Sequence, residues 1–225
     1  MTDRSTILRE MGLTPIWSLR GAVQPAVAEQ ATPIDPNRDA GIAEMSWEAL
    51  VTSIAHCTAC KLATTRNRPV PGGGDRAPSW MVIGSAPDQN EDKLGEPFVG
   101  KAGQLLDAML TAAGKKRTQG AFITHLIKCH PPGNRPPEAD EIAACAPYLK
   151  RQIALASPKL VLAAGESAGQ TLLNRDGTIA LLRATTGAFA GIPVVVTYHP
   201  AHLLGVPLDK GATWDDMLKA RAIAQ

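Results

Sequence analysis

Residues 80–114 read WMVIGSAPDQNEDKLGEPFVGKAGQLLDAMLTAAG. The apolar run at 80–84 predicts a buried strand that stops at a glycine turn. Residues 102–113 predict a helix that ends at Gly114. A buried strand followed by a helix is the repeating unit of an alternating α/β fold, so this stretch indicates the fold class.

The same alternation continues on both sides of this stretch. Further strands are predicted at 121–127, 159–164 and 192–197, and further helices at 46–55, 138–156 and 166–173. Strands that alternate with helices form parallel sheets covered on both faces. We therefore predict an α/β protein, a three-layer α/β/α fold with a central, mainly parallel sheet. In such a fold, ligands bind at the carboxyl ends of the strands.

Length, charge and apolar content exclude several classes of protein. The chain has 225 residues, enough for one principal core, and its 23 basic and 21 acidic side chains are too evenly balanced to indicate nucleic-acid binding by bulk charge. No apolar run approaches the roughly 20 residues that cross a bilayer, which argues against an integral membrane protein. The amino terminus lacks the continuous apolar stretch of a secretory signal. We therefore expect a cytoplasmic protein with any DNA contact confined to a local surface.

Four cysteines form a pattern that could bind a metal. Cys57 and Cys60 make a C-x2-C pair, while Cys129 and Cys145 follow far downstream. In a reducing compartment a disulfide framework is not expected. Four thiolates could close a tetrahedral site for zinc or an iron-sulfur cluster, and their spacing does not choose between the two. The alternative is one C-x2-C pair beside two ordinary buried cysteines.

The residues around the cysteines carry a family resemblance. The segments CTACKL, KCHPPGNRPP and EIAACAPYL, the long stretch at 84–106, and Thr197-Tyr198-His199-Pro200-Ala201 resemble the iron-sulfur uracil-DNA glycosylases of family 4. The resemblance covers most of residues 46–225. It implies a uracil-DNA-glycosylase-like fold and a structural 4Fe-4S cluster held by the four cysteines. Such a cluster would add its ligation energy to the stability of the domain.

The resemblance also implies a pocket for a flipped uracil. That chemistry uses a stacking ring, an amide that reads the base edge, an acidic group and a histidine. Phe98 and His199 stand at the positions of the ring and the histidine. The family's usual Gly-Glu-Ala-Pro-Gly is here Gly84-Ser85-Ala86-Pro87-Asp88, so a hydroxyl replaces the carboxylate. The family's usual Ile-Thr-Asn is here Ile123-Thr124-His125, so an imidazole replaces the base-reading amide.

These departures predict a vestigial pocket. Losing a preorganised charge-stabilising group commonly costs about 100-fold to 1000-fold in rate. Asp88 could substitute for the missing acid, Asn134 fits either a pocket role or a loop turn, and His199 could be a retained structural histidine. No catalytic residue is therefore expected to be fully functional. The vestigial set is Ser85, Asp88, Phe98, His125, Asn134 and His199.

Several basic residues flank the cysteines and the pocket. They could contact DNA phosphates, although such side chains are more often simply solvated. Together with the cluster they leave open a redox-responsive DNA-binding module as a further alternative. The residues are Lys61, Arg66, Arg68, Arg76, Lys128 and Arg135.

The first 44 residues differ in character from the rest. Residues 1–20 predict a docking peptide, residues 21–44 a flexible Ala/Pro-rich linker, and residues 45–225 the glycosylase-like domain. The alternative is an amino-terminal arm that packs on its own domain. Residues 11–20, MGLTPIWSLR, are similar to the amino-terminal peptide of the psi subunit of the bacterial DNA polymerase III clamp loader. The predicted anchors are Met11, Leu13, Ile16, Trp17, Leu19 and Arg20.

The two resemblances lead to one preferred hypothesis. The psi resemblance implies docking on the collar of the clamp-loader ATPase subunits, and binding of the chi subunit and through it single-strand-binding protein. We therefore predict a noncatalytic psi-like adaptor built on an inactive glycosylase fold. The alternative is an active family 4-like uracil-DNA glycosylase of base-excision repair, which would hydrolyse the N-glycosidic bond of uracil.

Overall fold

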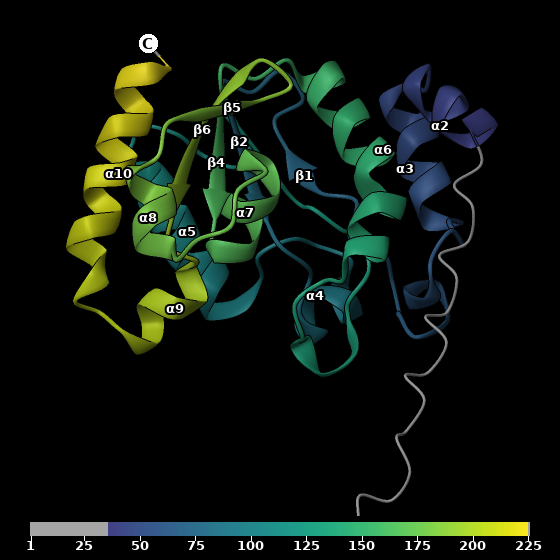
Figure 1. Ribbon diagram of the computed structural model, residues 1–225, viewed down its shortest axis with the longest axis horizontal. Helices are drawn as coiled ribbons and strands as arrows, with labels where there is room; N and C mark the ends of the chain where they lie inside the picture. Colours follow the sequence, from purple (N-terminus) through teal and green to yellow (C-terminus); the bar gives the residue numbers. More distant parts are fainter. Residues whose placement is uncertain (1–35, 225) are drawn as a thin grey trace, which may run out of the picture. The chain divides into compact units, whose positions relative to one another are not determined.

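A computed structural model describes residues 36–224 and contains one mixed sheet (Figure 1). The strand order is β1-β3-β2-β4-β6-β5. The inner pairs β3/β2, β2/β4 and β4/β6 are parallel, and the outer pairs β1/β3 and β5/β6 are antiparallel. The strands are β1 (Gly73–Gly74), β2 (Trp80–Gly84), β3 (Ala121–His125), β4 (Leu160–Ala164), β5 (Gly187–Phe189) and β6 (Ile192–Thr197).

Helices cover both faces of this sheet, which confirms the predicted three-layer α/β/α class (Figure 1). None of the helices described in residues 36–224 is both long and apolar enough to cross a membrane. The α-helices are α2 (Pro36–Ala43), α3 (Trp47–Ala55), α4 (Gln89–Leu94), α5 (Gly100–Ala112), α6 (Ala139–Ala156), α7 (Glu166–Leu173), α8 (Ile179–Ala184), α9 (Pro200–Gly205) and α10 (Asp209–Ile223). The 3-10 helices are η1 (Lys61–Thr64) and η2 (Pro132–Asn134).

The central strands are apolar on both faces because each face meets helices. Successive side chains of a strand point to opposite sides, so Trp80 and Val82 of β2 pack with α5 and α10. Met81 and Ile83 of the same strand pack with α6, α7 and α8. This double burial explains the uninterrupted apolar run from which the strand was predicted.

A third apolar cluster lies outside the sheet, between α2, α3 and α6. Ser46 caps α3 by accepting a hydrogen bond from the Ala49 backbone N–H at 3.3 Å. In α2, Ile42 is buried in this cluster. The predicted linker at 21–44 therefore differs from the structure over residues 36–43, which form a helix of the domain. The predicted docking peptide at 1–20 lies outside the described residues.

The parallel strands end together at one edge of the sheet. Gly84 at the end of β2 pairs in register with His125 at the end of β3. Ala164 of β4 pairs with Thr197 of β6 in the same way. The segments that follow these strands lead into α4, α7 and α9. Side chains from four chain segments therefore meet at this edge, where the sequence predicts a ligand site.

Candidate functional site

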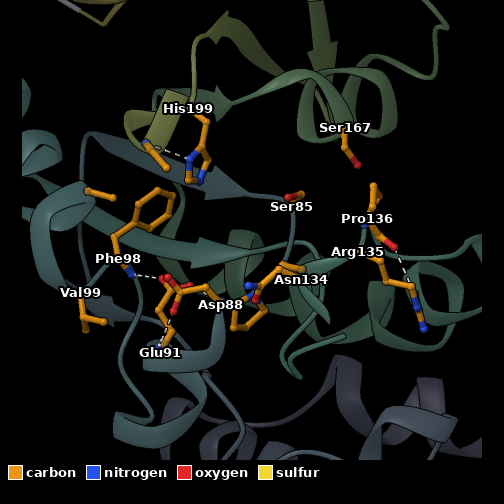
Figure 2. Close-up of a pocket in the computed structure, with 14 residues that line it drawn as sticks. Ser85, Asp88, Glu91, Phe98, Val99, Asn134, Arg135, Pro136, Ser167 and His199 are labelled. Carbon is orange, nitrogen blue, oxygen red and sulfur yellow. Dashed lines mark hydrogen bonds between the residues drawn. The ribbon is translucent and has the colours of Figure 1, made fainter. Parts of the chain in front are cut away.

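A cavity of about 420 Å³ opens at the carboxyl edge of the sheet (Figure 2). Five of the six residues predicted for the pocket line it, and His125 does not. The cavity is also lined by Glu91, which was not predicted. The lining residues are Ser85, Ala86, Pro87, Asp88, Glu91, Phe98, Val99, Ala102, Asn134, Arg135, Pro136, Ser167, His199 and Ala201.

Two carboxylates at the start of α4 form a reciprocal cap. The Asp88 side chain accepts hydrogen bonds from the backbone N–H groups of Asn90 and Glu91 at 2.7 and 2.8 Å. The Glu91 side chain accepts in turn from the backbone N–H of Asp88 at 2.6 Å. This capping box satisfies N–H groups that a helix start leaves unpaired. It holds both carboxylates at the edge of the cavity.

Glu91 is a residue of the cavity that the sequence reasoning missed. It is 6% exposed and accepts hydrogen bonds from the backbone N–H of Phe98 and from His125 Nε2, the latter at 3.1 Å. Burial by itself raises the pKa of Glu91, but the hydrogen bond and charge of His125 and the backbone N–H groups outweigh it. The pKa therefore lies below its ordinary value, and Glu91 is ionised at neutral pH. An acidic group is present although residue 85 is a serine.

Phe98 presents an aromatic ring to the cavity from a constrained backbone. Its φ of 50° lies in the left-handed region that side chains rarely adopt. Arg117 donates hydrogen bonds to the carbonyl oxygens of Pro97 and Phe98 at 2.8 and 2.6 Å and so fixes this turn. The ring stacks on the His125 and His199 rings, with centroids 4.9 and 5.2 Å apart.

Close packing at Gly103 gives a direct test of this constraint. A Cβ on Gly103 would lie 1.8 Å from the Phe98 carbonyl oxygen, which requires the Phe98 turn to move. Gly103→Ala is expected to lower the free energy of unfolding by about 1–3 kcal/mol and to disturb the cavity. Gly211→Ala is a matched control because a Cβ there meets nothing within 4 Å. Chemical denaturation measures both; equal stability of the two variants would contradict the expectation.

His199, the second residue that stacks on the Phe98 ring, is the N-cap residue of α9. Its Nδ1 accepts a hydrogen bond from the Ala201 backbone N–H at 3.2 Å, as Figure 2 shows. Burial lowers the pKa of His199 to about 4, and the neighbouring His125 acts in the same direction. The imidazole is therefore neutral at pH 7. Because Nδ1 accepts, the single ring proton lies on Nε2, which is free to donate.

His125 does not lie where the sequence analysis placed it, among the residues that line the pocket. It is 1% exposed and lies beneath the Phe98 ring, outside the lining of the cavity. A side chain in this place cannot contact a base in the cavity directly. The sequence analysis placed His125 in the vestigial pocket, and its burial corrects that placement.

The loop before α6 forms a second wall. Asn134 has a φ of 55° within η2, and its Oδ1 lies 2.7 Å from His130 Nε2. Arg135 donates two hydrogen bonds to the Glu141 carboxylate, at 2.6 and 2.9 Å. Asn134 therefore lies in the turn and also lines the cavity.

All four cysteines line a second cavity, which lies beside the third apolar cluster. All four are free thiols. Among the described residues, no group of three or more His, Cys, Asp or Glu side chains is arranged so that it could hold a metal ion. The donor set nevertheless consists of four sulfurs that face a single space, which fits a group bound by thiolates alone. Burial raises the pKa of Cys145 to about 12, so without such a group its thiol is protonated.

Two arginines bring positive charge to this cysteine cavity. Arg66 donates a hydrogen bond to Cys129 Sγ at 3.0 Å and another to the Cys57 carbonyl oxygen at 2.9 Å. Arg38 of α2 donates to the Ala144 carbonyl oxygen at 2.9 Å, and its Nη2 lies 3.9 Å from Cys57 Sγ. Cationic donors facing sulfur stabilise thiolates, which agrees with the ligand role predicted for the cysteines.

Most of the basic residues predicted to meet phosphates are engaged within the protein. Lys61 pairs with Glu138, and Arg76 with Glu48. Arg135 pairs with Glu141, and Arg66 donates a hydrogen bond to Cys129 in the cysteine cavity. Lys128 is 1% exposed, so its ammonium cannot reach a phosphate. These contacts show that five of the six named residues are paired or buried within the protein.

Comparisons with known proteins agree with this geometry. Residues 71–219 match the family described as the uracil DNA glycosylase superfamily. The chain is 39% identical to a type-4 uracil-DNA glycosylase of Sulfurisphaera tokodaii, over 80% of this chain and 85% of that protein. It is 37% identical to a type-4 enzyme of Pyrobaculum aerophilum, over 77% and 92%. A type-5 uracil-DNA glycosylase of the same organism is 33% identical, over 60% and 67%.

These similarities overturn the preferred prediction. Type-4 uracil-DNA glycosylases match this chain at 35–39% identity over 72–80% of its length. The noncatalytic clamp-loader adaptor is therefore the wrong interpretation, and so is the expectation that the protein is not an enzyme. The error came from treating Ser85 and His125 as the loss of two functions. The ionised Glu91 in the cavity removes the first of those two arguments.

Proposed function

The chain belongs to the uracil-DNA glycosylase superfamily, within its type-4 family, and from this premise we propose that it is an active uracil-DNA glycosylase. Its substrate would be a uracil in DNA, rotated out of the base stack into the cavity. The observation that carries the proposal is the meeting of three groups in one cavity: the Phe98 ring, the neutral His199 and the ionised Glu91.

The three groups divide the chemistry between them. The Phe98 ring offers an apolar surface against which a flipped base can stack. His199 Nε2–H donates a hydrogen bond to the oxygen of the departing base, on which negative charge develops. A neutral imidazole suits this role because it can donate while keeping its proton.

The carboxylates act on the sugar side of the bond. As the bond between the base nitrogen and C1′ breaks, positive charge develops on the sugar, and the Glu91 and Asp88 carboxylates stabilise it. Water then forms the new bond to C1′, and its released proton ends on the departed base or in solvent. The products are free uracil and an abasic site. Ser85 at the end of β2 can hydrogen-bond the base or the water.

We propose that the cysteine cavity holds a 4Fe-4S cluster in the native protein. Cys57, Cys60, Cys129 and Cys145 would hold it, and their common cavity supports this assignment. Its contribution when bound is structural, because it ties the segment after α3 to the loop after β3 and to α6. The same loop after β3 carries Asn134, so cluster binding orders one wall of the active cavity.

The direct test is release of uracil from DNA. Under enzyme excess, an oligonucleotide with a single uracil is expected to give free uracil by chromatography and a strand that breaks only after alkali treatment. The strand stays intact at first because no lysine is among the described residues that line the cavity, and none can form a Schiff base there. The same oligonucleotide with thymine is the control. Absence of free uracil under these conditions would defeat the proposal.

A further inference from the structure

The residue at the end of β3 is a buried histidine with an unusual set of neighbours. His125 is 1% exposed and lies between Gly84 of β2 and the Phe98 ring. A Cβ on Gly84 would lie 2.4 Å from His125 Nδ1 and 2.9 Å from Phe98 Cζ. Only a glycine at position 84 leaves room for this arrangement. The imidazole therefore fills the space beneath the aromatic wall of the cavity.

The hydrogen bond to Glu91 fixes the protonation of this imidazole. His125 Nε2 lies 3.1 Å from Glu91 Oε1. An ionised carboxylate only accepts hydrogen bonds, so Nε2 carries the proton. His125 Nδ1 has no hydrogen-bond partner among the described residues. Within residues 36–224, the His125 ring therefore makes its one polar contact with the carboxylate that enters the cavity.

Glu91 connects His125 to the rest of the site. The same carboxylate accepts hydrogen bonds from the backbone N–H groups of Asp88 and Phe98. Its position thus depends on the start of α4, on the Phe98 turn and on β3. Removing the β3 contact leaves the other two in place, so the carboxylate stays in the cavity with one restraint fewer.

We propose that His125 is a positioning residue for base excision: it holds the Glu91 carboxylate and supports the Phe98 ring without touching the base. His125 then sets the rate of excision and not the choice of base. Base choice is left to groups that line the cavity, Asn134 and Ser85 among them. The inference rests on the proposed glycosylase function and adds a role for a residue where the family resemblance implies a base-reading amide.

Two variants of His125 separate its contacts. His125→Phe keeps an aromatic ring against Phe98 but loses the donor to Glu91. His125→Gln keeps an amide donor of similar reach but loses the ring. Loss of a hydrogen bond to a charged group corresponds to about 10-fold to 100-fold. His125→Phe is expected to lower kcat by that factor with KM unchanged within about twofold, and His125→Gln is expected to recover part of the loss.

The pH profile reports on Glu91 directly. The titratable groups that face Glu91 are His125 from β3, Asp88 from the start of α4, and His199 before α9. Without the His125 donor the pKa of Glu91 rises, so a larger fraction of it is protonated at low pH. The acid limb of kcat/KM is expected to move to higher pH in His125→Phe. In a Glu91→Gln background the same replacement is expected to move the limb less, because only His199, whose pKa His125 also lowers, then remains to shift it.

Base preference distinguishes positioning from reading. Each variant is assayed on matched oligonucleotides that carry one uracil or one hypoxanthine, and the ratio of the two kcat/KM values is compared with that of the wild type. An unchanged ratio with lowered kcat supports positioning. A ratio changed by more than about 10-fold, or an acid limb that does not move, would overturn it. Asn134→Ala is the contrasting variant, for which a changed ratio is expected.

Two controls keep the result interpretable. Thermal unfolding of each variant shows whether it is folded at the assay temperature, and His125→Leu, which also lacks the donor to Glu91, replaces the Phe variant if the latter is not. A wild type that releases no base overturns the proposed function. An active wild type with altered base preference in the His125 variants overturns this inference alone.

Discussion

His199→Ala is expected to lower the single-turnover rate of uracil excision by about 100-fold to 1000-fold. The residue lines the cavity, and its pKa of about 4 keeps it neutral and able to donate through Nε2 at neutral pH. Its loss removes a donor that acts only as charge develops on the departing base. The affinity for uracil-containing DNA, measured separately by fluorescence anisotropy, is expected to change little.

The neighbouring His202 provides a matched control. It lies three residues away, pairs with Asp209 at 2.6 Å and stacks on Tyr198, but does not line the cavity. His202→Ala is expected to excise uracil at nearly the wild-type rate. Comparable losses in the two variants would show that excision depends on the fold around α9 and not on the His199 donor.

Cys145→Ser is expected to remove the iron-sulfur chromophore and to lower Tm by about 10 °C or more, because cluster ligation and folding are coupled. Cys145 lies on α6, while the three other cysteines precede that helix, so its loss detaches the helix from the cluster. Iron content and visible absorption measure the first effect, and calorimetry measures the second.

The wild-type protein stripped of iron by a chelator is the control for this variant. It should unfold at a temperature close to that of Cys145→Ser, since both lack the cluster. A purified wild type with no iron and no visible absorption, even when prepared without oxygen, would contradict the assignment. A variant that keeps the full chromophore would show that Cys145 is not a ligand.

The alternating elements were predictable because their signals are local. The buried strand at Trp80–Gly84, the helix at Glu166–Leu173 and the strand at Ile192–Thr197 have the predicted bounds. The helices α4 and α10 were not predicted. α4 has only six residues, all polar except Leu94, and its signal was the Asp88 to Glu91 capping box. α10 is weakly amphipathic, so its apolar positions give little periodic signal.

The candidate site was harder to predict than the fold. Aligning motif positions treats each position as a fixed role, so Ser85 was taken as the loss of the acidic group. In the structure, Glu91 supplies a carboxylate to the same cavity from the next helix. Likewise, His125 was counted among the pocket residues, since its burial under Phe98 depends on contacts between segments far apart in the sequence. Such contacts leave no local pattern.

The amino-terminal boundary shows the same limitation. Residues 36–43 contain few bulky apolar side chains, so composition favoured a linker. Two residues nevertheless join this segment to the domain. Ile42 is buried, and Arg38 donates a hydrogen bond to the Ala144 carbonyl oxygen and stacks over the Tyr148 ring. A single well-placed contact can outweigh the average character of a segment.

The two outermost strands of the sheet have a consequence for self-association. β1 has two residues and β5 has three, and both run antiparallel to their neighbours. Edge strands this short expose few unpaired backbone N–H and C=O groups to a strand of another molecule. The four parallel strands between them are thus shielded from pairing with strands of another molecule. Association of two copies by growth of the sheet is therefore disfavoured.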